Sequence, residues 1–127
     1  MMLRRRALEE VGSLDEGFFM YCEEVDWCLR ARQRGWQIHQ VPEATIVHHV
    51  ARSSVQFREK MLVELHRSRY RLFRKHYSPA FIVAHRAITR AGLTRSAIGA
   101  CWLALLGVVD RQELQARLRA YREIWSM

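Results

Sequence analysis

Three carboxylates stand close together in the segment FFMYCEEVDWCLRARQRGW, which covers residues 18–36. On a helix, Glu23 and Asp26 are three residues apart and share a face, whereas Glu24 is turned by about 100° from Glu23. Like charges at this spacing repel one another, and they are tolerated when they face a cation, a metal or a substrate, or when one of them acts as a general base. The alternative is electrostatic, because acidic residues in a first turn complement the helix dipole.

Two adjacent histidines, His48 and His49, stand near the end of the β-branched stretch ATIVHHV. Neighbouring side chains on a strand point to opposite faces, so one imidazole could ligate a metal ion with help from a carboxylate elsewhere, but not both. A hydrogen-bonded histidine without a metal is the alternative. Cys22 and Cys28 do not share a helical face, which predicts ordinary core cysteines instead of a metal-binding pair.

Length and composition predict one domain with a modest core, because the chain has 127 residues and 50% of them are hydrophobic. The three cysteines form no CxxC pair, which indicates a reducing compartment. The start, MMLRRRALEE, lacks the apolar run of a signal peptide, so we expect a cytoplasmic protein. The longest apolar stretch, over residues 97–109, is shorter than the roughly 20 residues that a membrane span needs.

The positive charge belongs to the second half of the chain. Residues 1–50 carry six Arg and eight Asp or Glu, a net charge of −2, whereas residues 51–127 carry fifteen Lys or Arg and five Asp or Glu, a net charge of +10. This asymmetry predicts an anionic partner for the second half, with lipid headgroups and nucleic acid as the candidates. A solvated, arginine-rich helical surface is the alternative.

The elements that must position the acidic residues are short helices followed by strands. RRRALEEVG predicts a short helix that stops at Gly12, and residues 19–35 predict a second helix. WQIHQVP and ATIVHHV predict two short strands around a turn at Pro42 and Glu43. The apolar stripe expected on the second helix consists of Val25, Cys28 and Leu29.

The second half of the chain is predicted to be helical. Residues 55–77 have the pattern of a long basic helix, which Pro79 interrupts. A helix over about 80–91 should follow, then the apolar segment 97–109. Asp110 is a plausible N-cap for the last helix.

An ordered string of motifs covers residues 2 to about 54: RR, VGxLDExFF, ExVDxCLR, GW, VPEA, HH and SS. This string closely resembles the C-terminal part of the catalytic domain of family-2 inverting glycosyltransferases, particularly the rhamnosyltransferase-like branch. The basic segment RSRYRLFRKHYS resembles them more loosely. The resemblance implies an α/β chain, an α+β fragment of a GT-A type fold, with short N-terminal helices and two short strands. Residues 1–54 would be the acceptor side of the catalytic domain, and residues 55–127 a basic helical extension.

The resemblance implies transfer of a sugar from a nucleotide diphosphate donor to an acceptor hydroxyl, in cell-envelope polysaccharide or glycolipid synthesis. Glu24, with Glu23 beside it, occupies the position of the general base, where the family usually has Asp. The longer side chain would shift the carboxylate by about an ångström, which can affect the rate strongly. Asp26 and Arg30 would support the helix, and Asp15 would lie near the acceptor.

The resemblance also implies a divalent cation, Mg or Mn, on the donor diphosphate of the complete enzyme, with His48 as a ligand and His49 as the second choice. The chain has no DxD motif, which in the family belongs to the nucleotide-binding half. We therefore expect the chain to look truncated, to be incomplete or inactive alone, and to need a donor-binding half from another chain. Its ligands would be a nucleotide-sugar donor and a glycan or lipid-linked acceptor.

A different class of function is a non-catalytic, basic helical module that binds an anionic membrane or nucleic acid. No helix-turn-helix or RNP sequence is found, which argues against nucleic acid. A peripheral contact with the inner face of the cell membrane would place Arg95 and Arg111 at the headgroups. Packing of residues 97–109 on the helix at 111–125 is the equal alternative. The side chains expected to insert are Trp102, Leu103, Leu105 and Leu106.

Overall fold

The computed structural model describes residues 1–45, 47 and 57–127. These residues form helices along most of their length, and 69% of them are helical. No described helix is both long enough and apolar enough to cross a membrane. The helices, in chain order, are α1 (Arg5–Val11), α2 (Glu23–Gln33), α3 (Arg58–His76), α4 (Pro79–Leu105) and α5 (Arg111–Ser126).

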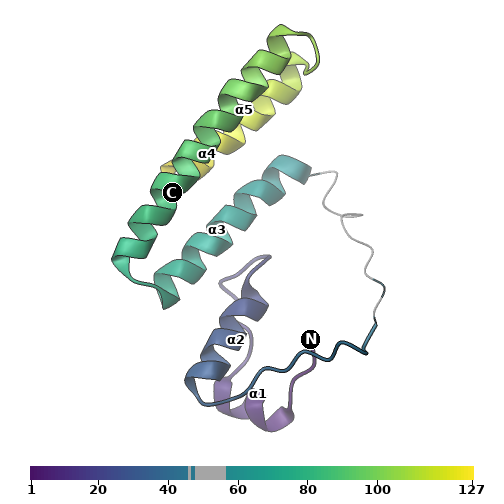
Figure 1. Ribbon diagram of the computed structural model, residues 1–127, viewed down its shortest axis with the longest axis vertical. Helices are drawn as coiled ribbons and strands as arrows, with labels where there is room; N and C mark the ends of the chain where they lie inside the picture. Colours follow the sequence, from purple (N-terminus) through teal and green to yellow (C-terminus); the bar gives the residue numbers. More distant parts are fainter. Residues whose placement is uncertain (46, 48–56) are drawn as a thin grey trace.

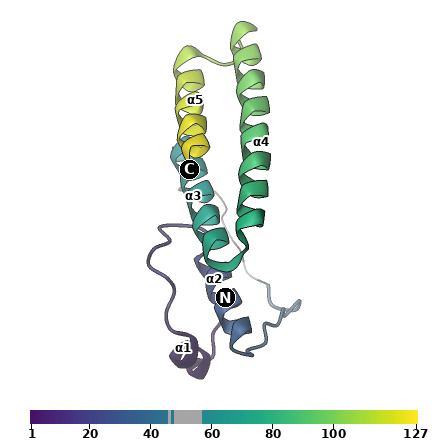
Figure 2. The ribbon, with the colours of Figure 1, turned by 90° about the vertical axis from the view of Figure 1, so that its left-hand side faces the viewer.

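The helices form two groups (Figure 1). Helices α3, α4 and α5 lie alongside one another, whereas the α1 and α2 pair lies near the end of α3 from which the chain turns into α4. The connection between α4 and α5 lies at the opposite end of the molecule from α1 (Figure 2). The acidic segment and the tip of the α4–α5 hairpin are therefore far apart along the long axis.

The α1 and α2 pair has its own small core of Ala7, Val11, Trp27 and Ala31. Helix α1 stops where Gly12 adopts a φ of 87°, a conformation that costs glycine little. The Trp27 indole donates a hydrogen bond of 2.8 Å to the carbonyl of Gly12. Side chains of α2 thus satisfy the carbonyl groups that the end of α1 leaves open.

The Arg30 guanidinium has the same role at this junction, donating to the carbonyls of Val11 at 2.9 Å and Ser13 at 2.8 Å. The Trp36 ring packs on the same core, and its indole donates to Glu10 at 3.0 Å. These contacts fix α2 against α1 with little buried apolar area.

Helices α3, α4 and α5 share a second core, formed by Val63, Leu93, Ala120 and Ile124. The Ser78 hydroxyl accepts from the amide of Phe81 at 3.3 Å and caps α4, which begins with a proline. The break expected at Pro79 is therefore confirmed.

The N-cap predicted for the last helix is confirmed as well. The Asp110 carboxylate accepts a hydrogen bond of 2.7 Å from the amide of Glu113, at the start of α5. A carboxylate in this position satisfies one of the open amide groups of the first turn.

The expected α/β class is wrong for the part of the chain that the structure describes, since no strand is found there. Residues 36–41, predicted as the first strand, have no regular structure. A strand needs a neighbour for its backbone hydrogen bonds, and no described segment offers one. Most of the second predicted strand, including His48 and His49, lies outside the described residues.

Two helix predictions also need correction. Helix α2 begins at Glu23 instead of near Phe19, and it buries Asp26, Trp27 and Ala31, whereas Val25 of the predicted stripe is exposed. The separate helices predicted over 80–91 and 97–109 are instead one helix that ends at Leu105. Glycine lowers helix propensity by only about 1 kcal/mol, so Gly92 and Gly99 do not break it.

Candidate functional site

The acidic pair follows a strained stretch of backbone. Tyr21 and Cys22 both have a φ of 69°, in the left-handed region that residues with a side chain rarely adopt. Such conformations cost on the order of 1–3 kcal/mol each and persist where the surroundings impose them, often at functional sites. Helix α2 begins at the next residue, so Glu23 and Glu24 occupy its first turn.

The two glutamates have different surroundings. The Glu24 side chain is exposed, whereas one carboxylate oxygen of Glu23 is buried without a hydrogen-bond partner among the described residues. Both stand at the positive end of the α2 dipole, where acidic side chains stabilise the helix. Burial, and then the charge of Glu24, raise the pKa of the Cys22 thiol, so this neighbour stays protonated.

Asp26 is the most completely buried side chain of this region, with an exposed fraction of 0%. Its Oδ1 accepts from Nζ of Lys75 at 2.8 Å and lies 2.7 Å from Nε2 of His76, and its Oδ2 accepts from Nε of Arg30 at 2.8 Å. Burial alone would raise the pKa of Asp26, but the hydrogen bonds from Lys75, His76 and Arg30 outweigh it and lower that pKa. A carboxylate held this way stays ionised.

Lys75 joins this buried site to the loop before α2. Its Nζ lies 2.8 Å from Asp15 Oδ2 as well as 2.8 Å from Asp26 Oδ1. The Lys75 hydrogen bond, followed by those from the Gly17 amide and from Arg71, holds the pKa of Asp15 well below its usual range. Burial would lower the pKa of Lys75, but its two carboxylate partners raise it.

Further contacts hold the loop on α3. The Ser68 hydroxyl donates to the carbonyl of Met20 at 2.6 Å, directly before the strained pair. The Arg71 guanidinium lies 5.3 Å from the ring centre of Phe18, at cation–π distance. It also passes Gly17 so closely that a Cβ there would lie 1.9 Å from its Nη2. The end of α3 therefore organises both the loop and the start of α2.

The described residues do not fit a divalent cation. Among them, no group of three or more His, Cys, Asp or Glu side chains is arranged to hold one. Asp15 and Asp26 are already paired with lysine and arginine side chains. The predicted ligands His48 and His49 lie outside the described residues.

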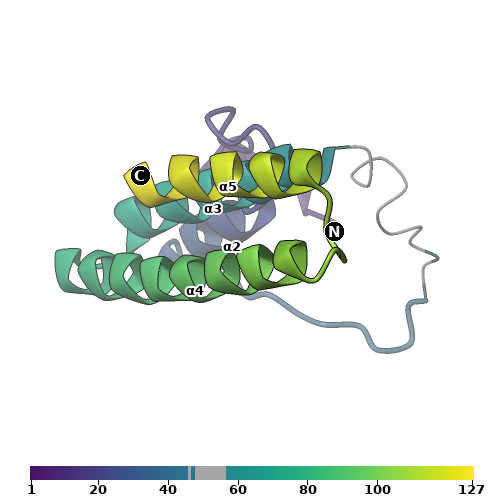
Figure 3. The ribbon, with the colours of Figure 1, turned by 90° about the horizontal axis from the view of Figure 1, so that it is seen from above.

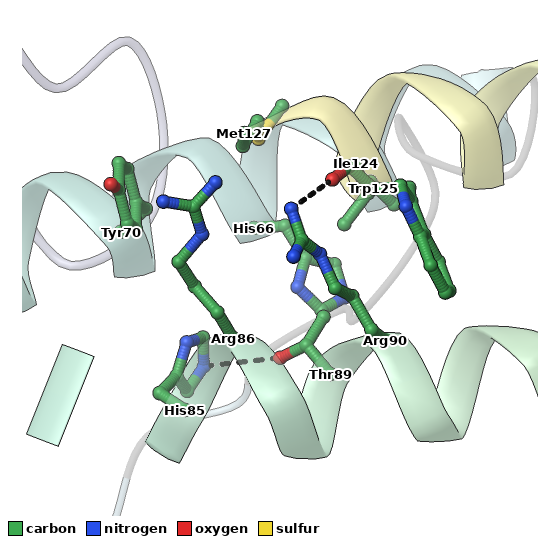
Figure 4. A pocket seen from close by; sticks show the side chains of 9 residues that line it. All are labelled: His66, Tyr70, His85, Arg86, Thr89, Arg90, Ile124, Trp125 and Met127. Atoms are coloured by element: carbon green, nitrogen blue, oxygen red, sulfur yellow. Dashed lines mark hydrogen bonds between the residues drawn. The ribbon is translucent and has the colours of Figure 1, made fainter. Parts of the chain in front are cut away.

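A separate small pocket lies where α3, α4 and α5 meet (Figure 4). Arg86 lies over the ring of Tyr70, and Arg90 lies over Trp125 and donates to its carbonyl at 3.2 Å. Burial, then the charges of Arg69 and His85, lower the pKa of His66, so its imidazole is neutral at pH 7. The lining is basic and aromatic and contains no carboxylate.

Part of the chain matches known glycosyltransferases. It is 39% identical over 70 residues to N-acetylglucosaminyl-diphospho-decaprenol L-rhamnosyltransferase of Mycobacterium tuberculosis, covering 55% of this chain and 23% of the relative. It is 35% identical over 60 residues to rhamnosyltransferase WbbL of Escherichia coli, covering 47% and 23%. About half of this chain is therefore similar to part of known rhamnosyltransferases.

The chain is also similar to the low-salt glycan biosynthesis hexosyltransferase Agl10 of Haloferax volcanii, with 34% identity over 65 residues, 51% of this chain and 21% of the relative. The chain thus aligns with less than a quarter of the length of each of these relatives. No protein-family model and no solved structure matches it. The resemblance predicted from the ordered motifs is confirmed at the level of rhamnosyltransferases and hexosyltransferases.

The structure brings part of the predicted site together. Asp15, Asp26 and Arg30 lie around one ionic cluster, and the glutamate pair begins the helix that carries Asp26 and Arg30. The sequence alone did not predict that Lys75 and His76, at the end of α3, belong to this cluster. The only sequence signal for them was the loose resemblance of the segment RSRYRLFRKHYS.

Proposed function

We propose that this chain supplies the acceptor side of an inverting, family-2 glycosyltransferase, with Glu24 as the general base. In this reaction the acceptor oxygen bonds to the anomeric carbon of the donor sugar, the bond from that carbon to the nucleoside diphosphate breaks, and Glu24 takes the hydroxyl proton. The match to rhamnosyltransferases and hexosyltransferases carries this proposal. The relatives' names point to cell-envelope or glycan synthesis, with a nucleotide-sugar donor and a glycan or lipid-linked acceptor.

The surroundings of Glu24 support this assignment. It is exposed, so an acceptor can reach it, and it lies in the first turn of α2, where the positive end of the helix dipole complements a carboxylate. Asp26 has three cationic or hydrogen-bonding partners and no exposed surface, so we assign it a positioning role. Glu23 would help to orient the acceptor.

The donor-binding half would come from a segment outside these 127 residues, in the same polypeptide or in another chain. Because the described residues do not fit a metal ion, no step of this proposal passes through Mg or Mn. If the complete enzyme uses such an ion, His48 and His49 are the predicted contributions of this chain. We also propose that the protein acts peripherally, on the inner face of the cell membrane.

A chimera tests the role of Glu24. The matching segment of the Mycobacterium tuberculosis rhamnosyltransferase would be exchanged for this one, and rhamnosyl transfer to N-acetylglucosaminyl-diphospho-decaprenol measured. Glu24→Gln in the chimera should lower kcat by roughly 10²–10⁴-fold, the usual contribution of a general base. Glu9→Gln, which changes an exposed carboxylate of α1 outside the ordered motifs, is the matched control and should change it little. Equal activity of the two variants would overturn the assignment.

A further inference from the structure

Helix α4 exposes an apolar surface along its full length. A stripe of seven side chains, spaced alternately four and three residues apart, lies on one side of the helix, and all seven are exposed. We call this surface the outer stripe, and it consists of Ala84, Ile88, Ala91, Arg95, Ile98, Trp102 and Leu105.

The outer stripe is an unusual surface for a helix of a water-soluble bundle, in which the exposed face is normally charged. Over Pro79–Leu105, all of which the structure describes, Arg95 is the only charged residue whose side chain is exposed. Ile88 is 73% exposed, Ile98 66% and Trp102 64%. Contiguous apolar patches of this kind mark contacts with a partner or a membrane.

The position of α4 leaves this side open among the described helices. Helix α4 lies at one edge of the helical group, with α3 and α5 on its other side (Figure 3). Its buried residue Leu93 belongs to the core shared with α3 and α5, and Ala100 is buried as well. At 1.5 Å per residue the helix is about 40 Å long, so the outer stripe is an extended surface.

The charges next to the stripe favour an anionic partner. Between Glu64 and Asp110 the sequence has no acidic residue and eight Lys or Arg. Arg86 and Arg90 face α3 and α5, where they lie over the rings of Tyr70 and Trp125, so Arg95 is the cation that the outer stripe itself carries. Arginine can bury its aliphatic stem in an apolar layer while its guanidinium reaches phosphate groups at the surface.

The position of Arg95 favours a membrane over a second copy of this chain as the partner of the outer stripe. It lies at the middle of the stripe, half-way between Ala84 and Leu105, so a symmetric dimer of either direction would set two Arg95 side chains against each other. Like charges at the centre of an apolar interface are unfavourable. At a bilayer surface the same side chain meets anionic headgroups instead.

We propose that the outer stripe of α4, continued by Leu106 and Val108 at the hairpin tip, lies in the surface of an anionic phospholipid bilayer. Helix α4 would lie along the membrane, with its apolar side chains among the acyl chains and Arg95 at headgroup level. This proposal specifies the surface that makes the protein peripheral, and it does not depend on the transferase chemistry.

Vesicle binding by the 127-residue chain tests the proposal. The chain should co-sediment with phosphatidylcholine vesicles that contain about one third phosphatidylglycerol. Ile88→Glu with Ile98→Glu should weaken this partitioning by at least tenfold. Ile38→Glu with Val41→Glu is the matched control, because both residues are exposed but lie outside the helices, and it should change partitioning less than twofold. Circular dichroism would verify that both variants stay helical.

Two further measurements complete the test. Arg95→Gln, which removes the charge without introducing a carboxylate, should weaken binding to the anionic vesicles about fivefold and leave the weaker binding to pure phosphatidylcholine nearly unchanged. Failure of the unmodified chain to bind anionic vesicles would overturn the proposal. So would sedimentation equilibrium showing a dimer that only the Ile88 and Ile98 variant dissociates, without a change in vesicle binding. The assay contains no donor or acceptor, so its failure would leave the role of Glu24 untouched.

Discussion

Replacing Asp26 by asparagine should destabilise the protein far more than the corresponding substitution in an exposed ion pair, Glu9→Gln. Asp26 and Arg30 form an i, i+4 pair at 2.8 Å with side chains 0% and 17% exposed, whereas Glu9 and Arg5 form the same type of pair at 3.0 Å with side chains 62% and 92% exposed. Both Asp26 oxygens accept from donors. Asparagine has one carbonyl oxygen, so its amide group must face a donor in either orientation.

The expected cost follows from burial. Removing the charge of a buried pair costs about 3–5 kcal/mol, because the remaining cations lose their partner. Glu9→Gln should cost about 0.2–0.5 kcal/mol. For a chain of this size, the first value corresponds to a fall in Tm of roughly 10–20 °C and the second to about 1–2 °C. Thermal unfolding followed by circular dichroism at pH 7 measures both.

The pH dependence of the Tm difference distinguishes an electrostatic cause of the destabilisation from a packing defect. The pKa of Asp26 is lowered by folding, so its contribution to stability is present above the ordinary carboxyl pKa of about 3.9 and is lost as the pH falls through the lowered pKa. The Tm difference between the parent and Asp26→Asn should therefore shrink below about pH 4. Equal Tm shifts for the two substitutions, or a difference that stays constant down to pH 3, would refute this account. If the Asp26 variant does not fold, Lys75→Met should give a shift of the same sign, smaller because Arg30 and His76 remain.

Three further substitutions or conditions test other parts of the structure. Asp110→Ala should lower the free energy of unfolding by about 1 kcal/mol in urea titrations, since it removes the N-cap of α5. Gly17→Ala should push the Arg71 guanidinium away, and NMR of the Arg71 side chain should show the loss of its ordered contact with Asp15; an unchanged spectrum would contradict the close approach. The neutral, half-buried His66 has a lowered pKa, so the stability it contributes is present above about pH 6.5 and is lost as the pH falls further. His66→Phe should flatten the stability profile between pH 7 and pH 5, and a profile identical to the parent's would exclude this contribution.

Local signals in the sequence located the ends of several helices. Gly12 after a short amphipathic run, Pro79 between two helical patterns and Asp110 before a third are residues whose backbone preferences act within one turn. Each marks the boundary that the structure has. Such signals are strong because they do not depend on what the rest of the chain does.

The predictions that were wrong concern segments whose structure depends on contacts with distant parts of the chain. Residues 36–41 alternate like a strand but have no strand beside them in the described part of the chain, so the alternation has no ladder to join. The start of α2 was set too early, because the left-handed conformations of Tyr21 and Cys22 delay it, and neither residue type announces such a backbone. Burial of Asp26 could not be foreseen from spacing, since its partners Lys75 and His76 are about 50 residues away.

The last turn of α3 connects the acidic pair of α2 to the outer stripe of α4. Lys75 and His76 bind Asp26, and only Tyr77 and Ser78 separate them from the start of α4. The ring of Tyr77 stacks on that of Phe81 at 4.5 Å, which stiffens this corner. The orientation of α4 is therefore tied to that of α2 through the last turn of α3.

This connection is ionic, because the apolar cores of the two helix groups have no residue in common among the described side chains. Loss of the Asp26 contacts should thus release α2 from α3 while the core of α3, α4 and α5 stays folded. Asp26→Asn should then reduce transfer by the chimera at temperatures at which the same variant of the 127-residue chain still binds vesicles through α4. Loss of both properties at the same temperature would mean that the two groups unfold as one unit, and that Asp26 supports the whole fold instead of positioning the acidic pair.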